Sequence, residues 1–488
     1  MNLLPKWAAR ESRASAIPLA ICRILFGLCL VFDIWALIDY APMWFDGVPY
    51  VEPAPRWVEL LLFIWLSVAI GLTVGAFSRV CASLNYLANV IFIGFFAMPA
   101  SCEFHPDALF LSTSFVLPFL PISRVWSLDA WRNPPTTRSI GPGSEIFFAL
   151  LVSSIYLDSA LWKLSSTMWM NGLGYWTPAT QPWPEQLSFA WSLENEWVAK
   201  TAGYGTLIFE LSFAVLVWFR PLRWLLLLIG LLLHVGIGVV FPLPIFGLIM
   251  VALLAALVPL KAPDEGLLAV ERTGLVRRFV PAYFALWASV SLLGVLHPLS
   301  TLSRVGLGGS NGQQHRPWYA ASETTLQRAV GAGFFWVYRL FGFRTHHIFL
   351  DDQFTRYTTQ TRLRFHSADA EAPSPWTNEN KGVDFFPPAY NRRFKAWHYR
   401  TAYALLPLRR VEERLRRWLN FHHGHGDIDL HDGWVTIEQR PIHMPIDAWV
   451  PGQRQRNLET PWRLAGVARG APGAIEFEWQ QPCWPTHQ

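Results

Sequence analysis

The sequence predicts an all-α polytopic membrane domain of about nine spans, followed by a small extramembrane α/β or mainly-β domain at the C-terminus. Of the 488 residues, 52% are hydrophobic and only 15% are charged, a balance that is unusual for soluble globular proteins. The 26 tryptophans agree with this prediction, because indole rings prefer the membrane–water interface. The net charge of +5 needs no nucleic-acid partner, since membrane proteins collect Lys and Arg on one side.

Apolar segments long enough to cross a bilayer recur along the chain. We expect spans at about 16–38, 57–77, 80–98, 107–121, 145–164, 202–219, 223–241, 244–260 and 279–296. The connections between them alternate between rich and poor in Lys and Arg, and the N-terminus belongs to the rich set. The positive-inside rule therefore places the N-terminus in the cytoplasm and, after nine spans, the C-terminus outside. The first span has no convincing cleavage site and is expected to be a signal anchor, which predicts a multi-pass protein of the bacterial inner membrane.

Composition divides the chain into three parts. Residues 1–300 are expected to form the membrane domain, residues 301–343 a connector, and residues 344–488 a periplasmic C-terminal domain. In the last part, "GWVTIEQRPI" and "AIEFEWQQ" have the pattern of strands. An apolar stripe at helical spacing runs from Leu408 to Leu419. We therefore expect one small mixed domain on the outer face of the membrane.

Polar residues inside the predicted spans indicate a polar interior, because charged groups are costly in hydrocarbon. They are Arg23, Asp33, Asn85, Asn89, Asp158, Lys163, Glu210 and His234. The two asparagines lie one helical turn apart and therefore share a face. Such groups either take part in chemistry or pair with each other to fix helix packing, as Arg23 could with Glu210.

Lys163 has two interpretations. Counted from Glu145 it lies about 27 Å along a helix, near the outer interface, where its ammonium could extend into the headgroups as an anchor. Alternatively, a dry pocket could favour the neutral amine, which is a base. Trp169 and Trp176 follow in the sequence and could wall such a pocket or belong to an ordinary aromatic belt. His105 lies in an outer connection on the same side, which would allow acid–base chemistry between the two.

The C-terminal part contains a histidine-rich stretch, "FHHGHGDIDLHDG", with His422, His423 and His425. This composition could bind a divalent metal, but the spacing matches no standard zinc or calcium pattern. We interpret the stretch as a polar turn between a helix and a strand, and we expect no metal. Cys102 and Cys483 both fall outside under the predicted topology, where a disulfide between them could persist.

The order of these pieces resembles the HTTM family, the membrane domain shared by vitamin K-dependent gamma-carboxylase and its bacterial relatives. The resemblance covers roughly residues 10–300 and rests on five segments: "AICRILFG", "FHPDALFLSTSFVLPFLPISRVWSLDAWR", "LWKLSSTMWMNGLGYW", "FELSFAVLVWFR" and "LLLHVGIGVV". The second segment ends in a Trp-Ser-x-Asp element that contains Asp129. We expect Asp129 and Arg23 to have structural roles.

In the family's carboxylase, a lysine at the place of Lys163 deprotonates vitamin K hydroquinone, and a histidine at the place of His105 assists. The resemblance therefore implies reduced quinone as the cofactor and favours the base over the anchor. The implied pocket residues are Asn85, Asn89, Trp169, Tyr175, Trp176, Glu210 and His234.

Three functions are compatible with these features. The first is a quinol-linked carboxylase, or related modification enzyme, that acts on a periplasmic peptide or protein. The second is a membrane redox protein that exchanges electrons with quinone without carboxylation. The third is a non-enzymatic maturation or assembly factor, with the outer domain as its binding surface.

Overall fold

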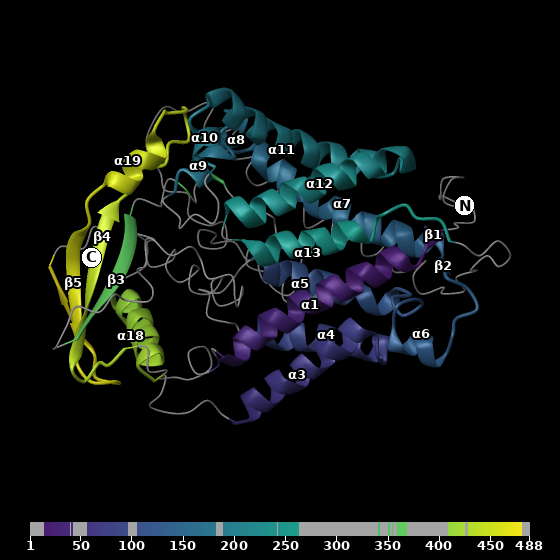
Figure 1. Cartoon of the computed structure of the whole chain (residues 1–488), viewed down its shortest axis with the longest axis horizontal. Coiled ribbons are helices and arrows are strands. Elements are labelled where there is room, and N and C mark those ends of the chain that lie inside the picture. The colour runs from purple at the N-terminus through teal and green to yellow at the C-terminus, as the bar shows by residue number, and fades with distance from the viewer. Residues whose placement is uncertain are drawn as a thin grey trace, which may run out of the picture.

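Helices make up most of the described residues of the computed structural model, and an antiparallel sheet lies at one end of the helical part (Figure 1). The structure describes residues 14–39, 41, 56–95, 105–181, 189–241, 243–262, 340–341, 350–351, 354, 359–367, 408–424 and 428–480. The predicted span at 279–296 and most of the predicted connector at 301–343 fall outside these residues. The predicted domain boundaries therefore stay predictions.

The long helices follow the predicted apolar segments in order. They are α1 (Ile17–Asp39), α3 (Arg56–Val74), α4 (Ser78–Asn89), α5 (His105–Val116), α7 (Pro142–Leu164), α11 (Glu196–Leu216), α12 (Arg220–Val240) and α13 (Pro244–Ala255). A π-helix at Val90–Phe95 continues α4, and a 3-10 turn at Leu117–Phe119 follows α5. In the described residues, α1 packs against α3 and α13, α13 packs against α12, and α7 packs against α11.

Short helices occupy the connections at both ends of this bundle. They are α6 (Leu128–Arg132), α8 (Thr167–Met170), α9 (Trp176–Ala179) and α10 (Ala190–Leu193). In Figure 1, α6 lies at the end of the bundle away from the sheet, together with a short pair of strands, β1 (Ala14–Ser15) and β2 (Ser139–Ile140). Helices α8, α9 and α10 lie at the opposite end, near the sheet.

Four of the described helices are long and apolar enough to cross a membrane, namely α1, α3, α7 and α12. Helix α13 is apolar but shorter. These helices agree with predicted spans, whereas the total of about nine spans is not established by the described residues and stays a prediction.

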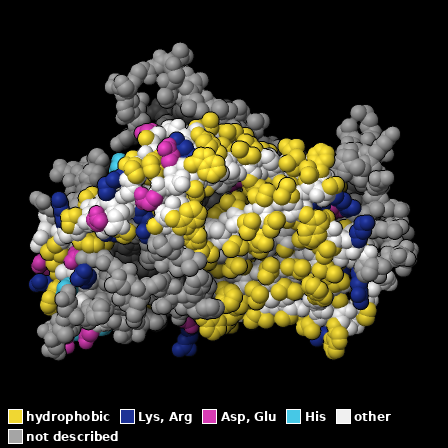
Figure 2. All heavy atoms as spheres, turned by 45° about the horizontal axis from the view of Figure 1, so that its top comes forward, with side chains coloured by type: hydrophobic (Ala, Val, Ile, Leu, Met, Phe, Trp, Pro, Cys, Tyr) yellow, Lys and Arg dark blue, Asp and Glu magenta, His cyan; other side chains and the backbone are white. Residues whose placement is uncertain are grey.

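The surface of the helical part is apolar over a wide area (Figure 2). On α11, Ile208 and Val215 are exposed, and on α12, Leu228 and Leu232 are exposed. Apolar patches of this extent are typical of surfaces that meet lipid or another protein. Lys and Arg side chains lie at both ends of this surface, and at the sheet end they are mixed with acidic side chains (Figure 2). The predicted orientation in the membrane stays a prediction.

In its described residues, the C-terminal part contains a four-stranded antiparallel sheet and two helices. The strands, in the order β3-β4-β5-β6, are Thr359–Ser367, Gly433–Pro441, Arg463–Arg469 and Glu476–Trp479. The helices are α18 (Leu408–Gly424) and α19 (Gln453–Glu459). Leu415 and Leu419 of α18 are buried in one cluster with Val435 and Ile437 of β4. Both quoted strand patterns and the amphipathic helix of the C-terminal part are thus confirmed.

Candidate functional site

A buried ion pair links α7 to α11 at the end of the bundle that faces the C-terminal part. Nζ of Lys163, in the last turn of α7, contacts Oε1 of Glu210 on α11. The two side chains are only 7% and 8% exposed. Ser159, one turn before the lysine, directs its hydroxyl to the same Oε1 at 3.5 Å. Buried charges of this kind are candidates for function, because an ion pair in a membrane interior is expensive to keep for packing alone.

The direction of the two helices explains why the lysine is buried. Side chains on an α-helix lean toward its N-terminus. Helix α7 ends at the end of the bundle where α11 begins, so Lys163 and Glu210 both lean along their helices toward each other. The stem of Lys163 is therefore directed back into the bundle. The alternative role as a headgroup anchor would need an exposed ammonium, and this geometry does not provide one.

Trp169 of α8 covers the ion pair. Nζ of Lys163 lies 4.5 Å from the centroid of its ring, a cation–π distance, and Trp169 is buried. Gly174 makes room for the indole, because a Cβ at this position would come within 2.2 Å of the Trp169 ring. The Gly-x-Gly stretch after the tryptophan is thus partly explained by close packing.

The amine of Lys163 contacts both the carboxylate of Glu210 and the ring of Trp169. The prediction of a free amine in a dry pocket did not include this carboxylate partner. Glu210 is therefore placed to exchange a proton with Lys163.

A second buried pair lies beside the first. The hydroxyl of Tyr156 on α7 and Nε2 of His234 on α12 are 2.7 Å apart. Tyr156 interacts electrostatically with Glu210, and His234 with Lys163. Nδ1 of His234 has no hydrogen-bond partner among the described residues. Phe209 packs edge-on against Tyr156, with ring centroids 5.3 Å apart. The polar groups of α7, α11 and α12 thus form one cluster within an aromatic surround.

Tyr175 and Trp176, the two other aromatic residues of the predicted pocket, join the segment after α8 to α10. Tyr175 donates or accepts a hydrogen bond of 2.6 Å with the hydroxyl of Ser192. Burial raises the pKa of Tyr175, and this hydrogen bond lowers it in part. Nε1 of Trp176 donates to the carbonyl of Leu193 at 3.1 Å, and the ring belongs to the same hydrophobic cluster as Trp169.

The two predicted asparagines form a separate cluster. Asn85 accepts a hydrogen bond from Nε1 of Trp65 at 2.9 Å and donates to Ser114 at 2.8 Å. Asn89 donates to the backbone carbonyl of Asn85 at 2.8 Å, as expected for residues on one helix face. Their partners are on α3, α4 and α5, not on α7, α11 or α12. In this structure the asparagines join neighbouring helices and do not touch the Lys163–Glu210 pair.

Arg23 lies at the opposite end of the bundle. It donates to the carbonyls of Ile122, at 2.9 Å, and of Trp126. The suggested pairing of Arg23 with Glu210 is therefore wrong, because the arginine binds backbone carbonyls near α6. Gly75 allows this arrangement, since it has a φ of +74° and a Cβ there would come within 2.6 Å of Nη1 of Arg23.

Asp129 of α6 holds the start of α4. Its two carboxylate oxygens accept from the amides of Phe77 at 2.8 Å and Ser78 at 2.7 Å. Burial alone would raise the pKa of Asp129, but these amides and the charge of Arg132 outweigh it and hold the pKa below its usual value. In this geometry Asp129 binds the first amides of α4, and Arg23 joins α1 to the loop before α6.

A family model of the HTTM domain matches residues 12–260. The chain belongs to the HTTM family. The match covers α1 to α13, and so includes both the Lys163–Glu210 pair and the Arg23–Asp129 end of the bundle. No curated protein and no solved structure matches the chain.

Several predicted site residues of this HTTM protein lie outside the described residues, in whole or in part. Helix α5 begins at His105, but its side chain is not described, so its predicted role beside Lys163 stays untested. Cys102 and Cys483 are both outside, and so is their predicted disulfide.

The histidine-rich stretch begins in the last turn of α18, which contains His422 and His423, and ends at Gly433, where β4 starts. Nδ1 of His423 accepts from the amide of Leu430 at 3.2 Å. His425 and the side chain of His422 lie outside the described residues. Across the described part of the chain, no three His, Cys, Asp or Glu residues are grouped as metal ligands.

Sequence reasoning missed Tyr156 and Ser159. Neither hydroxyl is ionisable at neutral pH, and both were therefore passed over in favour of Asp158. The spacing held a usable signal, because residues 156, 159 and 163 recur at helical intervals on one face of α7. A search for polar residues on the face that carries Lys163 would have found them.

Proposed function

We propose that this HTTM protein is a membrane enzyme in which Lys163 accepts a proton from a quinol. The observation that carries the proposal is the buried Lys163–Glu210 pair beneath the ring of Trp169. A buried amine with a carboxylate partner is suited to proton transfer, because a shared proton can move between them at low cost when both are desolvated. The family resemblance supplies the quinol as substrate.

The donor set fits a quinol chemically. A quinol is a flat, largely apolar ring with hydroxyl groups, and the site offers aromatic walls and proton-accepting side chains. Proton transfer would proceed in two steps. The ammonium of Lys163 first gives one proton to the Glu210 carboxylate, and the neutral amine then takes the hydroxyl proton of the quinol. The pair gains one positive charge and the substrate one negative charge, so the overall charge is unchanged.

The Tyr156–His234 pair has a supporting role in this proposal. Because both groups interact electrostatically with the ion pair, they can adjust where its proton lies without exchanging protons with solvent. We further propose that the site faces the periplasm of a bacterial inner membrane. The support for this orientation is the alternation of connections rich and poor in Lys and Arg along the sequence.

Quinol consumption by the purified protein in nanodiscs, with reduced quinone and oxygen, tests the proposal. We expect turnover by the wild type and a loss of about 100-fold in Glu210→Gln, which cannot take the proton from Lys163. Full turnover by Glu210→Gln would contradict the proton transfer described here. Adding bicarbonate and a Glu-containing peptide then separates a carboxylase from a quinone redox protein, since only a carboxylase adds carboxyl mass to the peptide.

A further inference from the structure

The C-terminal part of the chain holds the helix that covers the candidate site. The carboxylate of Asp351 caps the first turn of α8. Its Oδ1 accepts from the hydroxyl of Ser166 at 2.7 Å and from the amide of Met168 at 2.9 Å. Its Oδ2 accepts from the amide of Thr167 at 2.6 Å. One side chain from beyond the HTTM match thus fixes three donors at the start of α8.

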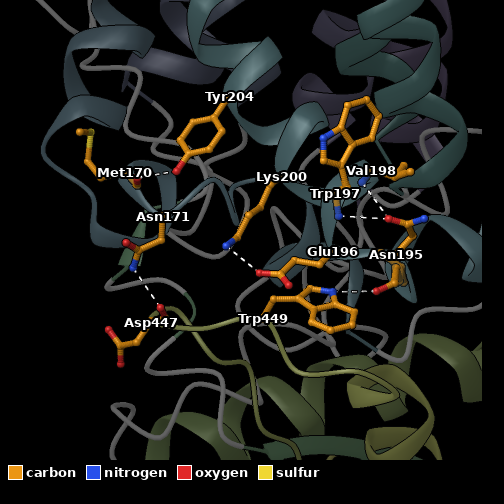
Figure 3. A network of polar contacts seen from close by, with 11 residues as sticks. Met170, Asn171, Asn195, Glu196, Trp197, Val198, Lys200, Tyr204, Asp447 and Trp449 are labelled. Carbon is orange, nitrogen blue, oxygen red and sulfur yellow. Dashed lines mark hydrogen bonds and ion pairs between the residues drawn. The ribbon is translucent and has the colours of Figure 1, made fainter.

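A second line of contacts holds the far end of the same segment (Figure 3). The side-chain amide of Asn171 donates to the carbonyl of Asp447 at 3.2 Å. Nε1 of Trp449 donates at 3.0 Å to the carbonyl of Leu193, which also accepts from Trp176. The loop between β4 and α19 is therefore hydrogen-bonded to the segment from α8 to α10. Two separate stretches of the C-terminal part hold it, one before β3 and one after β4.

The segment from α8 to α10 contains Trp169, whose ring lies on the Lys163–Glu210 pair. Trp169 follows directly after the amides that Asp351 binds, and its own amide donates to Ser166 at 3.4 Å. Its indole contacts Nζ of Lys163, and Gly174 leaves no free space behind the ring. A shift of α8 would therefore move the ring away from Lys163, because the close packing prevents the ring from moving separately from the helix.

We propose that the C-terminal domain is a clamp that positions α8 over the Lys163–Glu210 pair, and that Asp351 is the positioning residue. The domain thereby sets how closed the site is, and a ligand that pulled the domain away would uncover Lys163. Only the predicted effect of the clamp on turnover rests on the proposed function. The position of α8 over Lys163 can be measured without any reaction.

Asp351→Asn, compared with Asp447→Asn, tests the clamp in the full-length protein. The first variant replaces an acceptor oxygen with an amide that cannot accept from Thr167 or Met168. The second removes the same charge from the same interface, but Asp447 contributes only its backbone carbonyl and its side chain is exposed (Figure 3). Comparing the two variants separates the loss of the cap from the loss of a charge.

Two measurements report on the site directly. Hydrogen–deuterium exchange follows the amides of Thr167 and Met168, and acetic anhydride followed by mass spectrometry measures the reactivity of Lys163. Lys200, whose side chain is 39% exposed, serves as the internal reference. In Asp351→Asn we expect about fivefold to tenfold faster exchange and labelling, the effect of losing a helix cap. Asp447→Asn should match the wild type, and Asp351→Glu should restore part of the protection.

Turnover then distinguishes the two proposals. If Asp351→Asn also loses about tenfold in quinol turnover, both the clamp and the proposed function are supported. If exchange and labelling increase while the wild type consumes no quinol, the clamp stands and the proposed function fails. Unchanged exchange and labelling in Asp351→Asn would overturn the clamp, whatever the activity.

A second variant covers the case in which Asp351→Asn does not fold. Thr177→Val keeps the shape of the side chain and removes a 2.7 Å hydrogen bond from the Thr177 hydroxyl to the carbonyl of Pro445. We expect about twofold to fivefold faster labelling of Lys163 in this variant. If labelling stays at the wild-type rate here as well, the clamp is wrong.

Discussion

Breaking the Lys163–Glu210 pair from one side should cost far more stability than removing both charges. Lys163→Met keeps a straight side chain and removes the amine, and Glu210→Gln keeps the shape and removes the charge. Each single variant leaves one charged group in a site where the side chains are 7% and 8% exposed. We expect each to lower the free energy of unfolding by about 3–5 kcal/mol, the usual cost of an uncompensated buried charge. Loss of the contact with Trp169 adds about 0.5–2 kcal/mol for Lys163→Met.

The double variant Lys163→Met/Glu210→Gln leaves no buried charge at the pair. We expect its free energy of unfolding to lie within about 2 kcal/mol of the wild type, so that the cycle gives a coupling of at least about 4 kcal/mol. Reversible unfolding in mixed micelles with increasing SDS measures all four proteins. The exposed pair Lys200–Glu196, with side chains 39% and 48% exposed, is a control in which the same changes should cost less than about 1 kcal/mol. If the stability losses of the two single variants simply add in the double variant, the ion pair is refuted.

Three further predictions concern packing, pH and topology. Gly174→Ala should lower stability in thermal unfolding by about 1–3 kcal/mol, because the new methyl would overlap the indole of α8; Gly205→Ala, with no atom within 4 Å of the new Cβ, should be neutral or stabilising. Because the pKa of Asp129 is lowered by folding, its contribution is present above the unfolded pKa and is lost as pH falls through the folded pKa. Asp129→Asn should therefore unfold at lower temperature at pH 7, and the difference from the wild type should shrink in acid; a constant difference would contradict the cap. For topology, each cysteine variant is made in a protein without its native cysteines. Ala471→Cys should react with an impermeant maleimide in intact bacterial cells, and Thr136→Cys should react only after the inner membrane is opened. The reverse result would invert the topology.

The depth of Lys163 in the bundle could be predicted from the sequence, but its partner could not. Counting along one helix places the lysine near the C-terminal end of its span, because the rise per residue is fixed. Its contact with Glu210 depends on α7 and α11 being neighbours, and these helices are separated by a long connection with several short helices. Hydropathy assigns spans but says nothing of which spans touch.

The error at Arg23 has the same origin. Opposite charges in two spans suggest a pair, but Arg23 lies near the start of α1, at the α6 end of the bundle. There its Nη1 and Nη2 donate to the backbone carbonyls of Ile122 and Trp126. A loop that offers carbonyls leaves no pattern in the sequence, so this partner could not be foreseen.

The pairing within the asparagine cluster was only half predictable. Residues four apart on a helix must share a face, and Asn85 and Asn89 are indeed hydrogen-bonded. Their partners Trp65 and Ser114 come from other helices. Asp351 was not foreseen at all, because an aspartate before a strand is unremarkable until the fold brings it to the start of α8.

Quinol turnover by Lys163→Arg is the most direct test of the proposal that Lys163 is the base. Arginine can keep an ion pair with Glu210 and a cation–π contact with Trp169, but a guanidinium does not give up its proton in a protein. If the lysine amine accepts the quinol proton, the variant should remain folded in nanodiscs and lose turnover by about 100-fold or more. A folded Lys163→Arg protein that consumes quinol at the wild-type rate would contradict the account, because Lys163 would then be needed only as a positive charge.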